Sequence, residues 1–408
     1  MHRCLLDVRA ASWRSMALAW AFGCTLLSGV AQAAGPWVPA RDSEVVEVLR
    51  ERSLTAQEKA WRALRAQARA QPGDVTLAVA VASQAIQWSR QDGDPRWLGQ
   101  AQAALGHWWT QATPPPEVRL LRATVLQSTH DFNAALRDLR ALAQLPATAL
   151  LPAQRAQAWL TLASVLQVTA RYDEAQRACE ALAQVPDQVP HPVPSPWLSQ
   201  ACSLELRSHR GEADAAQRGL TQLAQQAPRE GSGLVQLIRA ELAERLGQPE
   251  QAALLYQALL LRQSDAYTEG AYADLLLDQG RAAEVLSLLK GRERNDALLL
   301  RLAEAGAAVN DPANAQRVAA LRARFAAARE RGDSVHRREE ARFTLRLLRQ
   351  PAQALQLAQR NWAVQKEPAD ARILLEAARA AGVAQPVADM RSFMQRWGWS
   401  DRRLEALL

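Results

Sequence analysis

The stretch Trp159–Pro186 most constrains what this chain can fold into, because it carries two adjacent helical patterns and a defined stop. Apolar residues recur at helical spacing between Trp159 and Leu166, and again between Tyr172 and Leu182. This spacing places them on one face of an α-helix. The closing proline ends the second pattern, since it cannot donate the backbone hydrogen bond that a helix interior needs. The two apolar faces are too large to bury against each other alone, so the stretch predicts a helical hairpin that packs on neighbouring hairpins.

Similar hairpin patterns recur on both sides of this stretch. The small residue at the equivalent point of each second helix is Ala135, Ala175, Ala216, Ala252 and Val285, with spacings of 40, 41, 36 and 33 residues. The composition fits helices, because 49% of the 408 residues are hydrophobic and only 5% are aromatic. The first two spacings hold insertions, one of which is the proline-rich run from Pro186 to Pro196. That run predicts an extended connector, with a proline-rich ligand motif as the alternative.

The hairpin at Trp159–Pro186 resembles the tetratricopeptide repeat (TPR), a 34-residue pair of helices. The residues that match the family pattern are Trp159, Leu162, Ala163, Leu166, Ala170, Tyr172, Ala175, Cys179, Leu182 and Pro186. Cys179 and Leu182 replace the usual aromatic residue and alanine, and the proline falls one place early. The resemblance implies an all-α fold, a right-handed superhelical solenoid of TPR-like helical hairpins. It also implies a scaffold that binds other proteins, in a chain similar to exported bacterial TPR proteins.

The sequence predicts four segments along this solenoid. They are a signal peptide at 1–33, an N-terminal helical capping region at 34–112, core TPR-like repeats at 113–290, and degenerate C-terminal TPR-like repeats with a cap at 291–408. The polar ending Asp401–Arg403 predicts a solvent-facing final cap. Tryptophans are concentrated in the capping region, where we expect them to pack one open end of the stack. The alternative is a Trp-lined binding pocket formed by Trp88, Trp97, Trp108 and Trp109.

Residues 1–33 have the three parts of a secretory signal. A positive start with Arg3, Arg9 and Arg14 precedes an apolar segment, and Ala31-Gln32-Ala33 forms an A-x-A cleavage site. A retained membrane anchor and a lipid-modified Cys24 are the alternatives. The signal predicts an exported protein, in a bacterial periplasm, with no membrane insertion after the signal is removed.

Charge and motifs argue against nucleic-acid binding and catalysis. The formal net charge is +7, of which the leader carries +2, and the remaining +5 is spread along the chain without a basic stripe. The sequence has no zinc-type histidine pair, no nucleophile elbow and no phosphate-binding glycine loop. We therefore predict no enzyme, cofactor, metal or nucleic-acid partner. The acidic pair Glu339-Glu340 lies among arginines and predicts solvated ion pairs, and Arg331-Gly332-Asp333 indicates a helix stop and cap rather than an adhesion motif.

Two cysteines remain once the leader is removed. Cys179 lies on the second predicted helix of one hairpin and Cys202 on the first helix of the next. In TPR stacks those two elements pack together, and an exported protein meets an oxidising environment. We expect a disulfide between them, with a pair of buried free thiols as the alternative.

The resemblance also implies a binding surface. In TPR stacks the first helices line the concave face, and their non-core positions contact the ligand. The predicted partner-binding residues are Gln127, Ser164, Gln167, Glu241, Arg245, Asp274, Asp278 and Arg346. The TPR subclass that grips a peptide carboxylate needs an asparagine where this chain has Thr124, Ser164 and Glu241, so we expect a different protein or peptide partner. The alternative function is a structural adaptor subunit of a cell-envelope assembly for secretion or polysaccharide.

Overall fold

The computed structural model describes residues 41, 43–45, 53–186, 194–228, 231–333 and 335–408. Residues 1–54 and 55–408 form two separate units. The predicted signal peptide, Cys24 and most of the proline-rich connector lie outside the described residues.

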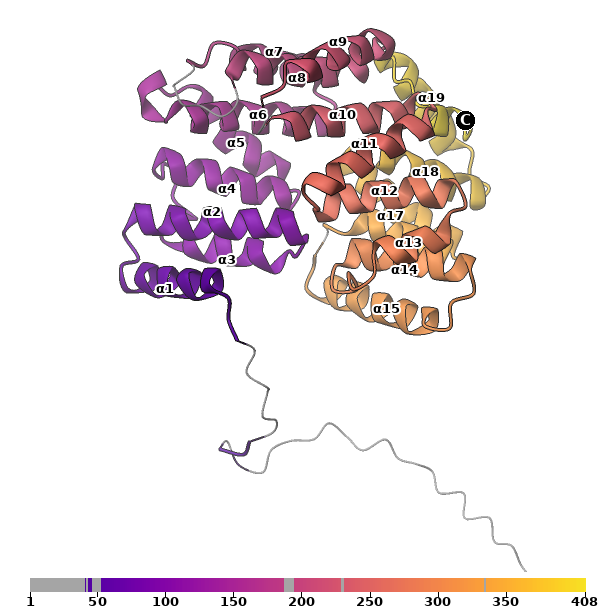
Figure 1. Ribbon diagram of the computed structural model, residues 1–408, viewed down its shortest axis with the longest axis horizontal. Helices are drawn as coiled ribbons and strands as arrows, with labels where there is room; N and C mark the ends of the chain where they lie inside the picture. Colours follow the sequence, from indigo (N-terminus) through magenta and orange to yellow (C-terminus); the bar gives the residue numbers. More distant parts are fainter. Residues whose placement is uncertain (1–40, 42, 46–52, 187–193, 229–230, 334) are drawn as a thin grey trace, which may run out of the picture. The chain divides into compact units, whose positions relative to one another are not determined.

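Residues 55–408 fold into α-helices, and no strand occurs in the described part (Figure 1). The first half holds α1 Ala56–Ala70, α2 Val75–Asp92, α3 Arg96–Ala104, α4 Pro116–Ser128, α5 Phe132–Ala143, α6 Pro152–Val168, α7 Tyr172–Leu182, α8 Ser195–Ser208, α9 Ala213–Gln225 and α10 Ser232–Arg245, with 3-10 turns η1 Gly106–Trp108 and η2 Ala147–Ala149. The second half holds α11 Pro249–Arg262, α12 Ala266–Asp278, α13 Ala282–Leu288, α14 Asp296–Ala308, α15 Asn314–Glu330, α16 Arg337–Arg346, α17 Pro351–Val364, α18 Pro368–Ala380, α19 Gln385–Trp397 and α20 Arg402–Glu405. An all-α solenoid of helical hairpins is thereby confirmed.

A left-handed residue marks the turn of each hairpin from α4 onward. The residues with positive φ at these turns are His130, Ala170, Gly211, Gly247, Gly280, Asn310, Arg349 and Gly382. In most of these turns the N–H of the next residue donates to a carbonyl five residues back, as in Arg171 N to Leu166 O at 2.7 Å. This arrangement satisfies carbonyls at the end of the first helix. The hairpins continue beyond residue 291, where the sequence pattern is weakest.

The α6–α7 hairpin shows why the repeat residues recur. Ala163 and Ala175 are buried where the two helices meet, and Tyr172 and Leu182 fill the space beside them. Cys179 is also buried at the place where the repeat pattern has an aromatic residue. Burial of apolar surface between adjacent hairpins supplies most of the stability of such a stack.

The stack curls until its C-terminal helices meet the first helices of earlier hairpins. One apolar core contains residues of α5, α6 and α7 together with residues of α17, α18 and α19. The indole N–H of Trp399 donates to the hydroxyl of Tyr172 at 3.1 Å, and Lys366 N donates to Val168 O at 2.8 Å. Gly398 lies so close to the α8–α9 turn that an added Cβ would stand 3.0 Å from the backbone nitrogen of Gly211.

The end of the chain departs from the sequence prediction. The solvent-facing cap expected at Asp401–Arg403 is wrong for two of its three residues. Asp401 is only 1% exposed, and the Arg403 guanidinium donates to the buried carboxylate of Glu244. Arg402 alone faces solvent. The polar residues turn inward because earlier hairpins present carboxylates to them. The segment boundaries at 113 and 291 stay predictions.

Candidate functional site

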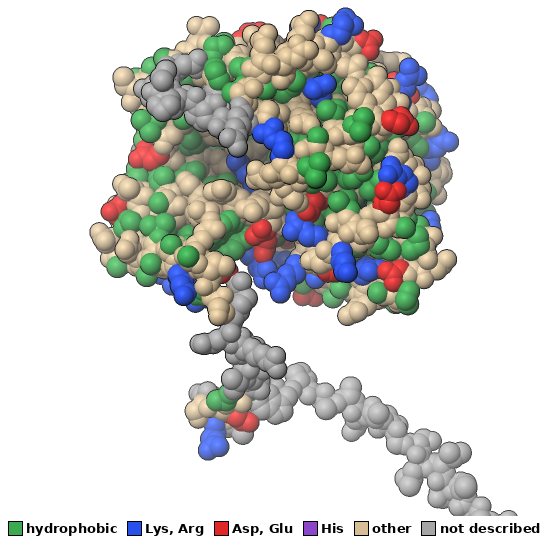
Figure 2. All heavy atoms as spheres, in the orientation of Figure 1, with side chains coloured by type: hydrophobic (Ala, Val, Ile, Leu, Met, Phe, Trp, Pro, Cys, Tyr) green, Lys and Arg blue, Asp and Glu red, His purple; other side chains and the backbone are tan. Residues whose placement is uncertain are grey.

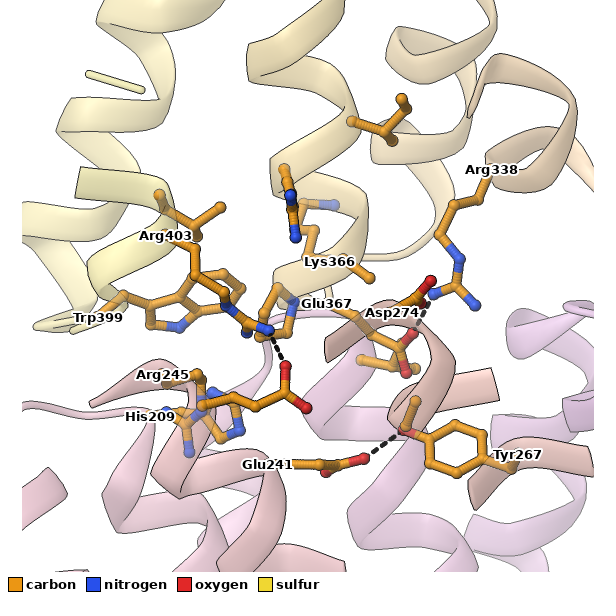
Figure 3. A pocket seen from close by; sticks show the side chains of 18 of the residues that line it. His209, Glu241, Arg245, Tyr267, Asp274, Arg338, Lys366, Glu367, Trp399 and Arg403 are labelled. Atoms are coloured by element: carbon orange, nitrogen blue, oxygen red, sulfur yellow. Dashed lines mark hydrogen bonds and ion pairs between the residues drawn. The ribbon is translucent and has the colours of Figure 1, made fainter. Parts of the chain in front are cut away.

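A cavity of about 280 Å³, here called the chamber, lies where the curled stack meets itself (Figure 3). Its walls come from the first helices α6, α8, α10 and α12 on one side. On the other side they come from α14, α16, α18 and the residues around α20. Most of the lining side chains are charged, with aromatic rings from Tyr172, Tyr256, Tyr267 and Trp399 among them.

Most of the predicted partner-binding residues lie on the wall of the chamber. They are Ser164, Gln167, Glu241, Arg245, Asp274, Asp278 and Arg346. Gln127 is not on the wall, but its amide donates to the Ser164 hydroxyl at 3.3 Å. The structure brings these side chains together because each comes from the inner side of a first helix. Their role in binding a partner stays a prediction.

One position of the repeat carries an acidic residue in five hairpins. Six residues before the left-handed turn residue stand Glu205, Glu241, Asp274, Glu304 and Glu376. Because the turn fixes the end of each first helix, equal distance from it places a side chain on the same face. These five carboxylates, here called the acidic row, therefore follow one another along the inner side of the curled stack.

Two arginines of α16 bind later members of this acidic row, and a third, Arg338, pairs with Glu339, Glu367 and Asp370 outside it. Arg338, Arg342 and Arg346 stand four residues apart and so share one helix face. The Arg342 guanidinium donates to both oxygens of Glu304 at 2.7 and 2.6 Å and lies 2.7 Å from Asp274. Arg346 donates to both oxygens of Glu376, at 2.8 Å each.

Two further arginines, Arg301 and Arg372, pair with carboxylates of the same region. Together with Arg342 and Arg346 they form a series of ion pairs, here called the ladder. Arg301 lies 2.5 Å from Asp274, and Arg372 bridges Asp278 at 2.5 Å and Glu376 at 2.8 Å. Bidentate pairs of this kind combine charge with fixed geometry. They tie α12 and α14 to α16 and α18 across the chamber.

The arginines outweigh the cost of burying these acids. Desolvation would raise the pKa of Asp274, but Arg301 and Arg342 hold it well below its usual range. At Glu376 desolvation likewise raises the pKa, but Arg346 and Arg372 lower it by more, so the pKa lies below its ordinary value. Arg338 similarly lowers the pKa of Glu339 to about 2 against desolvation. These carboxylates are charged in the folded protein at neutral pH.

The first two members of the acidic row have no such neighbour. Desolvation raises the pKa of Glu205, and it raises that of Glu241 to about 7, with Glu205, Glu244 and Glu367 adding repulsion. Glu205 accepts from the Gln167 amide at 3.2 Å, and Glu241 accepts from the Tyr267 hydroxyl at 2.5 Å. Tyr267 is 60% exposed, and it is part of the chamber wall.

Near α20, a second group of polar side chains surrounds Glu244. Desolvation raises the pKa of Glu244 to about 7, although Arg403 and the Tyr256 hydroxyl, which donates at 2.5 Å, both favour its charged form. Arg245 donates to the carbonyl and hydroxyl oxygens of Ser208 at 3.0 and 2.7 Å. Burial, followed by the Arg245 charge, lowers the pKa of His209 well below its ordinary value, so this imidazole is neutral at pH 7.

Sequence reasoning missed the arginine side of the chamber. The solvated ion pairs predicted around Glu339-Glu340 are wrong, because these side chains are 12% and 9% exposed and face the interior. Arg338, Arg342 and Arg372 were not identified as inner-face residues. The four-residue spacing on α16 was the available signal, but such spacing also occurs on solvated helices. Only the curling of the stack distinguishes the two cases.

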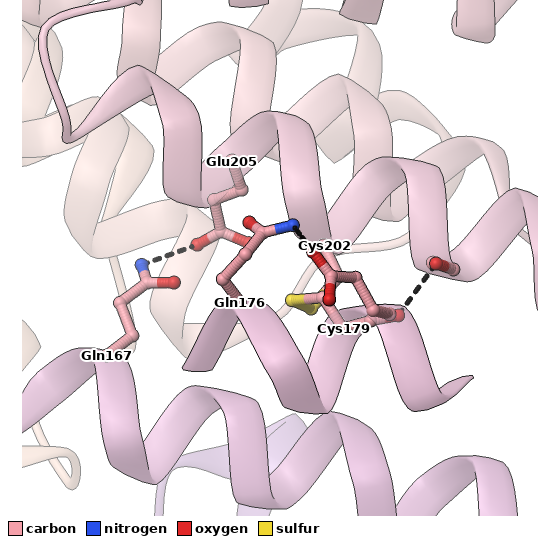
Figure 4. Close-up of a disulfide and its surroundings, with 7 residues drawn as sticks. Gln167, Gln176, Cys179, Cys202 and Glu205 are labelled. Carbon is pink, nitrogen blue, oxygen red and sulfur yellow. Dashed lines mark hydrogen bonds between the residues drawn. A yellow bond between two sulfur atoms is a disulfide. The ribbon is translucent and has the colours of Figure 1, made fainter. Parts of the chain in front are cut away.

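The structure contains a disulfide between Cys179 and Cys202, with Cα atoms 5.6 Å apart (Figure 4). It joins α7 to α8 across the proline-rich connector, closing a loop with a sequence separation of 23. Glu205 lies on α8 three residues beyond Cys202, and the Gln167–Glu205 hydrogen bond joins α6 to the same helix. The bond therefore fixes the helix that carries one of the chamber carboxylates.

Three tryptophans of the N-terminal region pack against one another. The ring centroids of Trp61, Trp88 and Trp97 lie 4.7 to 5.2 Å apart. Trp108 is buried in the same apolar core. The end cap at 34–112 and the alternative of a Trp-lined binding pocket both stay predictions.

The outer surface shows mixed charge. On the face seen in Figure 2, basic and acidic side chains are interspersed over much of the second unit. None of the described helices is long and apolar enough to cross a bilayer. No group of three or more possible metal-ligating side chains occurs within the described ranges.

Comparisons with known proteins add little to this account. No protein-family model matches the sequence, and no curated protein is detectably similar to it. Among solved structures, the Cut9–Hcn1 hetero-tetramer of the APC/C is similar over 86% of this chain and 86% of its own, with 9% identity and a TM-score of 0.31. The TPR domain of P58(IPK) is similar over 79% of this chain and 93% of its own, with 13% identity and a TM-score of 0.20. Such low scores carry no argument, so the fold rests on the chain's own hairpins.

Proposed function

We propose that this protein is an exported, non-enzymatic interaction scaffold that takes a short projecting segment of a partner protein into the chamber. The observation that carries the proposal is the convergence of inner-face polar side chains from α6, α8, α10 and α12 on one cavity. These are the positions where the resemblance to TPR proteins places ligand contacts. Rigid helices hold them, so little ordering entropy is lost on binding.

The size of the chamber limits what it accepts. Its volume of about 280 Å³ is just below the range of about 300–1,000 Å³ for ligand pockets. A long peptide along the inner face would have to displace α18 and α20, which contact that face through Arg372 and Arg403. A single side chain or a chain end fits without that cost. The partner therefore presents a short segment.

Export rests on the sequence of residues 1–33. The positive start, apolar segment and A-x-A site are the parts that a secretory signal needs. An oxidising compartment also suits the Cys179–Cys202 disulfide. N-terminal sequencing of the mature protein from its native host tests this part, and we expect it to begin at Ala34. A protein that keeps residues 1–33, or carries lipid on Cys24, would contradict it.

Site-specific photocrosslinking in the native host tests the scaffold function. A diazirine-bearing lysine analogue replaces Gln167 on the chamber wall, and the control carries it at exposed Glu250 on α11. We expect a discrete crosslinked protein from position 167 and not from position 250. Adding Ala271→Trp, which fills the chamber from α12, should abolish that product. Equal products from both sites, or products that survive the filling, would exclude the chamber as the binding site.

The same experiment distinguishes the alternative function. A structural adaptor of a cell-envelope assembly would be held through its outer surface. Crosslinks would then form from position 250 to one or more envelope proteins and would be insensitive to Ala271→Trp.

A further inference from the structure

In the acidic row, some carboxylates pair with arginines of the chain and others do not, so the two kinds can be compared at the same position of the repeat. At Asp274, Glu304 and Glu376 the chain supplies two guanidinium groups to each carboxylate. Glu205 and Glu241 form no ion pair among the described residues, although the position in the repeat is the same. The charge of Arg245 acts on both from a distance, but its guanidinium donates to Ser208. The five sites therefore share a geometry and differ in whether the chain neutralises them.

The two remaining carboxylates keep unused acceptor capacity toward the chamber. Each forms one side-chain hydrogen bond through Oε1, from Gln167 to Glu205 and from Tyr267 to Glu241. Neither Oε2 atom has a hydrogen-bond donor among the described side chains, and neither is fully buried. A carboxylate can accept about four hydrogen bonds in all. Glu205 on α8 and Glu241 on α10 thus each present a carboxylate oxygen that can accept further hydrogen bonds from a group in the chamber.

We propose that a guanidinium group, the side chain of an arginine on the partner segment, binds between Glu205 and Glu241. This inference rests on the proposed function and names the group that the chamber recognises. A guanidinium carries five donors in a plane and pairs with two carboxylates at once, as Arg342 does with Asp274 and Glu304. The bound arginine extends the chain's own ladder of arginines by one rung.

Tyr267 supports the choice of a guanidinium. Its hydroxyl bonds to Glu241, and its largely exposed ring forms part of the wall beside this carboxylate (Figure 3). Planar guanidinium groups stack on aromatic rings more often than ammonium groups do. A bound cation also offsets the repulsion from Glu205 and Glu367, which adds to desolvation in raising the pKa of Glu241.

Binding of small probes to the purified mature protein tests the inference. The probes are N-acetyl-arginine amide, its uncharged isostere N-acetyl-citrulline amide, and N-acetyl-lysine amide, measured by calorimetry at pH 8. We expect the arginine probe to bind about 10- to 100-fold more tightly than the citrulline probe, the range that one to two charge-assisted hydrogen bonds provide. The lysine probe should fall between them. Glu205→Gln and Glu241→Gln should each weaken arginine binding by about tenfold or more, whereas Glu250→Gln on the outer helix α11 should not.

The outcomes separate this inference from the proposed function. Equal binding of the arginine and citrulline probes, or no binding of either, overturns the inference using the wild-type protein alone. Arginine binding that is unchanged in both glutamine variants overturns it as well. If the position-167 crosslink forms in any of these cases, the scaffold function stands and only the recognised group is wrong. If the crosslink is absent but the arginine probe binds as expected, the chamber takes a free cationic ligand and not a partner segment.

Discussion

At the scale of single residues, the acidic row shows that carboxylates at the same position of the repeat can have their pKa shifted in opposite directions. Asp274 is held ionised because two guanidinium groups offset its desolvation, whereas Glu241 forms no ion pair among the described residues and desolvation raises its pKa to about 7. The repeat places both side chains alike, so their neighbours decide the difference. Buried carboxylates are stable only when their hydrogen bonds and charges are met.

We predict that Arg342→Leu destabilises the protein by about 3–5 kcal/mol, the usual cost of removing one partner of a buried ion pair. The substitution removes the bidentate partner of the nearly buried Glu304 carboxylate and leaves it only Arg346, at 3.2 Å. Arg207→Leu is the control, because Arg207 pairs with Glu212 at the surface and should cost about 1 kcal/mol or less. Chemical denaturation measures both. Equal, small losses in the two variants would show that the ladder does not hold the chamber together.

We predict that Glu241→Gln changes how stability depends on pH. The folded pKa of Glu241 is about 7, above its ordinary value of 4.5. Between these values the folded state holds a proton that the unfolded state has released, so the stability of the wild-type protein falls as the pH rises from about 5 to 7. Below pH 4.5 Glu241 is protonated in both the folded and the unfolded state, so it adds no pH dependence to the stability.

The glutamine variant lacks this contribution. Its free energy of unfolding, relative to wild type, should therefore be higher at pH 8 than at pH 5, by about 1–3 kcal/mol. Denaturation curves at pH 5, 6, 7 and 8 measure the difference, with Glu250→Gln as the control that follows wild type. Parallel profiles for wild type and Glu241→Gln would contradict the prediction.

At the scale of elements, the left-handed turn residue sets where each first helix ends. Four of these turns use a residue other than glycine: His130, Ala170, Asn310 and Arg349. A side chain in this region clashes with its own backbone and costs about 1–2 kcal/mol. The hairpins tolerate the cost because packing of the two helices fixes the turn.

We predict that Arg349→Gly stabilises the protein by about 0.5–1 kcal/mol, because it relieves the strain at φ 57° and the side chain is exposed. Arg360→Gly is the matched control, since Arg360 is an exposed arginine inside α17, where glycine should cost about 1 kcal/mol. Thermal and urea denaturation give both values. A loss of stability in Arg349→Gly would mean that its side chain has a structural role.

The disulfide acts between elements. We predict that replacing Cys179 and Cys202 by alanine costs about 3 kcal/mol, because the unfolded chain regains the freedom of the loop of 23 residues. Mass spectrometry after alkylation, with and without reductant, reports whether the bond forms in the mature protein. Alkylation of both thiols without reductant would rule the bond out.

At the scale of the whole molecule, the C-terminal helices cover the inner side of earlier hairpins. Beside the apolar core that these helices share, the contacts include polar pairs, among them Arg403 with Glu244, Arg372 with Asp278 and Trp399 with Tyr172. They convert an open concave face into an enclosed chamber. The groups available to a partner are consequently few and well defined.

We predict that deleting residues 398–408 opens this arrangement. Tyr172 loses the Trp399 indole and Glu244 loses Arg403, so the helices α6, α8 and α10 should show faster amide hydrogen exchange. Helices α14 and α15 take no part in the two hydrogen bonds that are lost, so their amide exchange rates serve as the internal reference. Unchanged exchange in α6–α10 would show that the chain end does not hold the chamber closed.

The sequence by itself determined the elements of this protein. Helical spacing, prolines and small residues such as Ala163 and Ala175 predicted the hairpins, because these signals act within about one helical turn to a few tens of residues. The inner-face residues could be named for the same reason, since the repeat fixes which side of a first helix faces inward. The two cysteines could be paired because adjacent hairpins always pack together.

Only the tertiary structure decided what the inner face contains. The pairing of Asp274 with Arg342, and of Glu244 with Arg403, joins residues 68 and 159 positions apart. No local pattern records such contacts, because they depend on how small rotations between successive hairpins add up along the stack. That accumulated curvature brought arginines to three carboxylates of the row and left Glu205 and Glu241 on the chamber wall without an ion pair among the described residues.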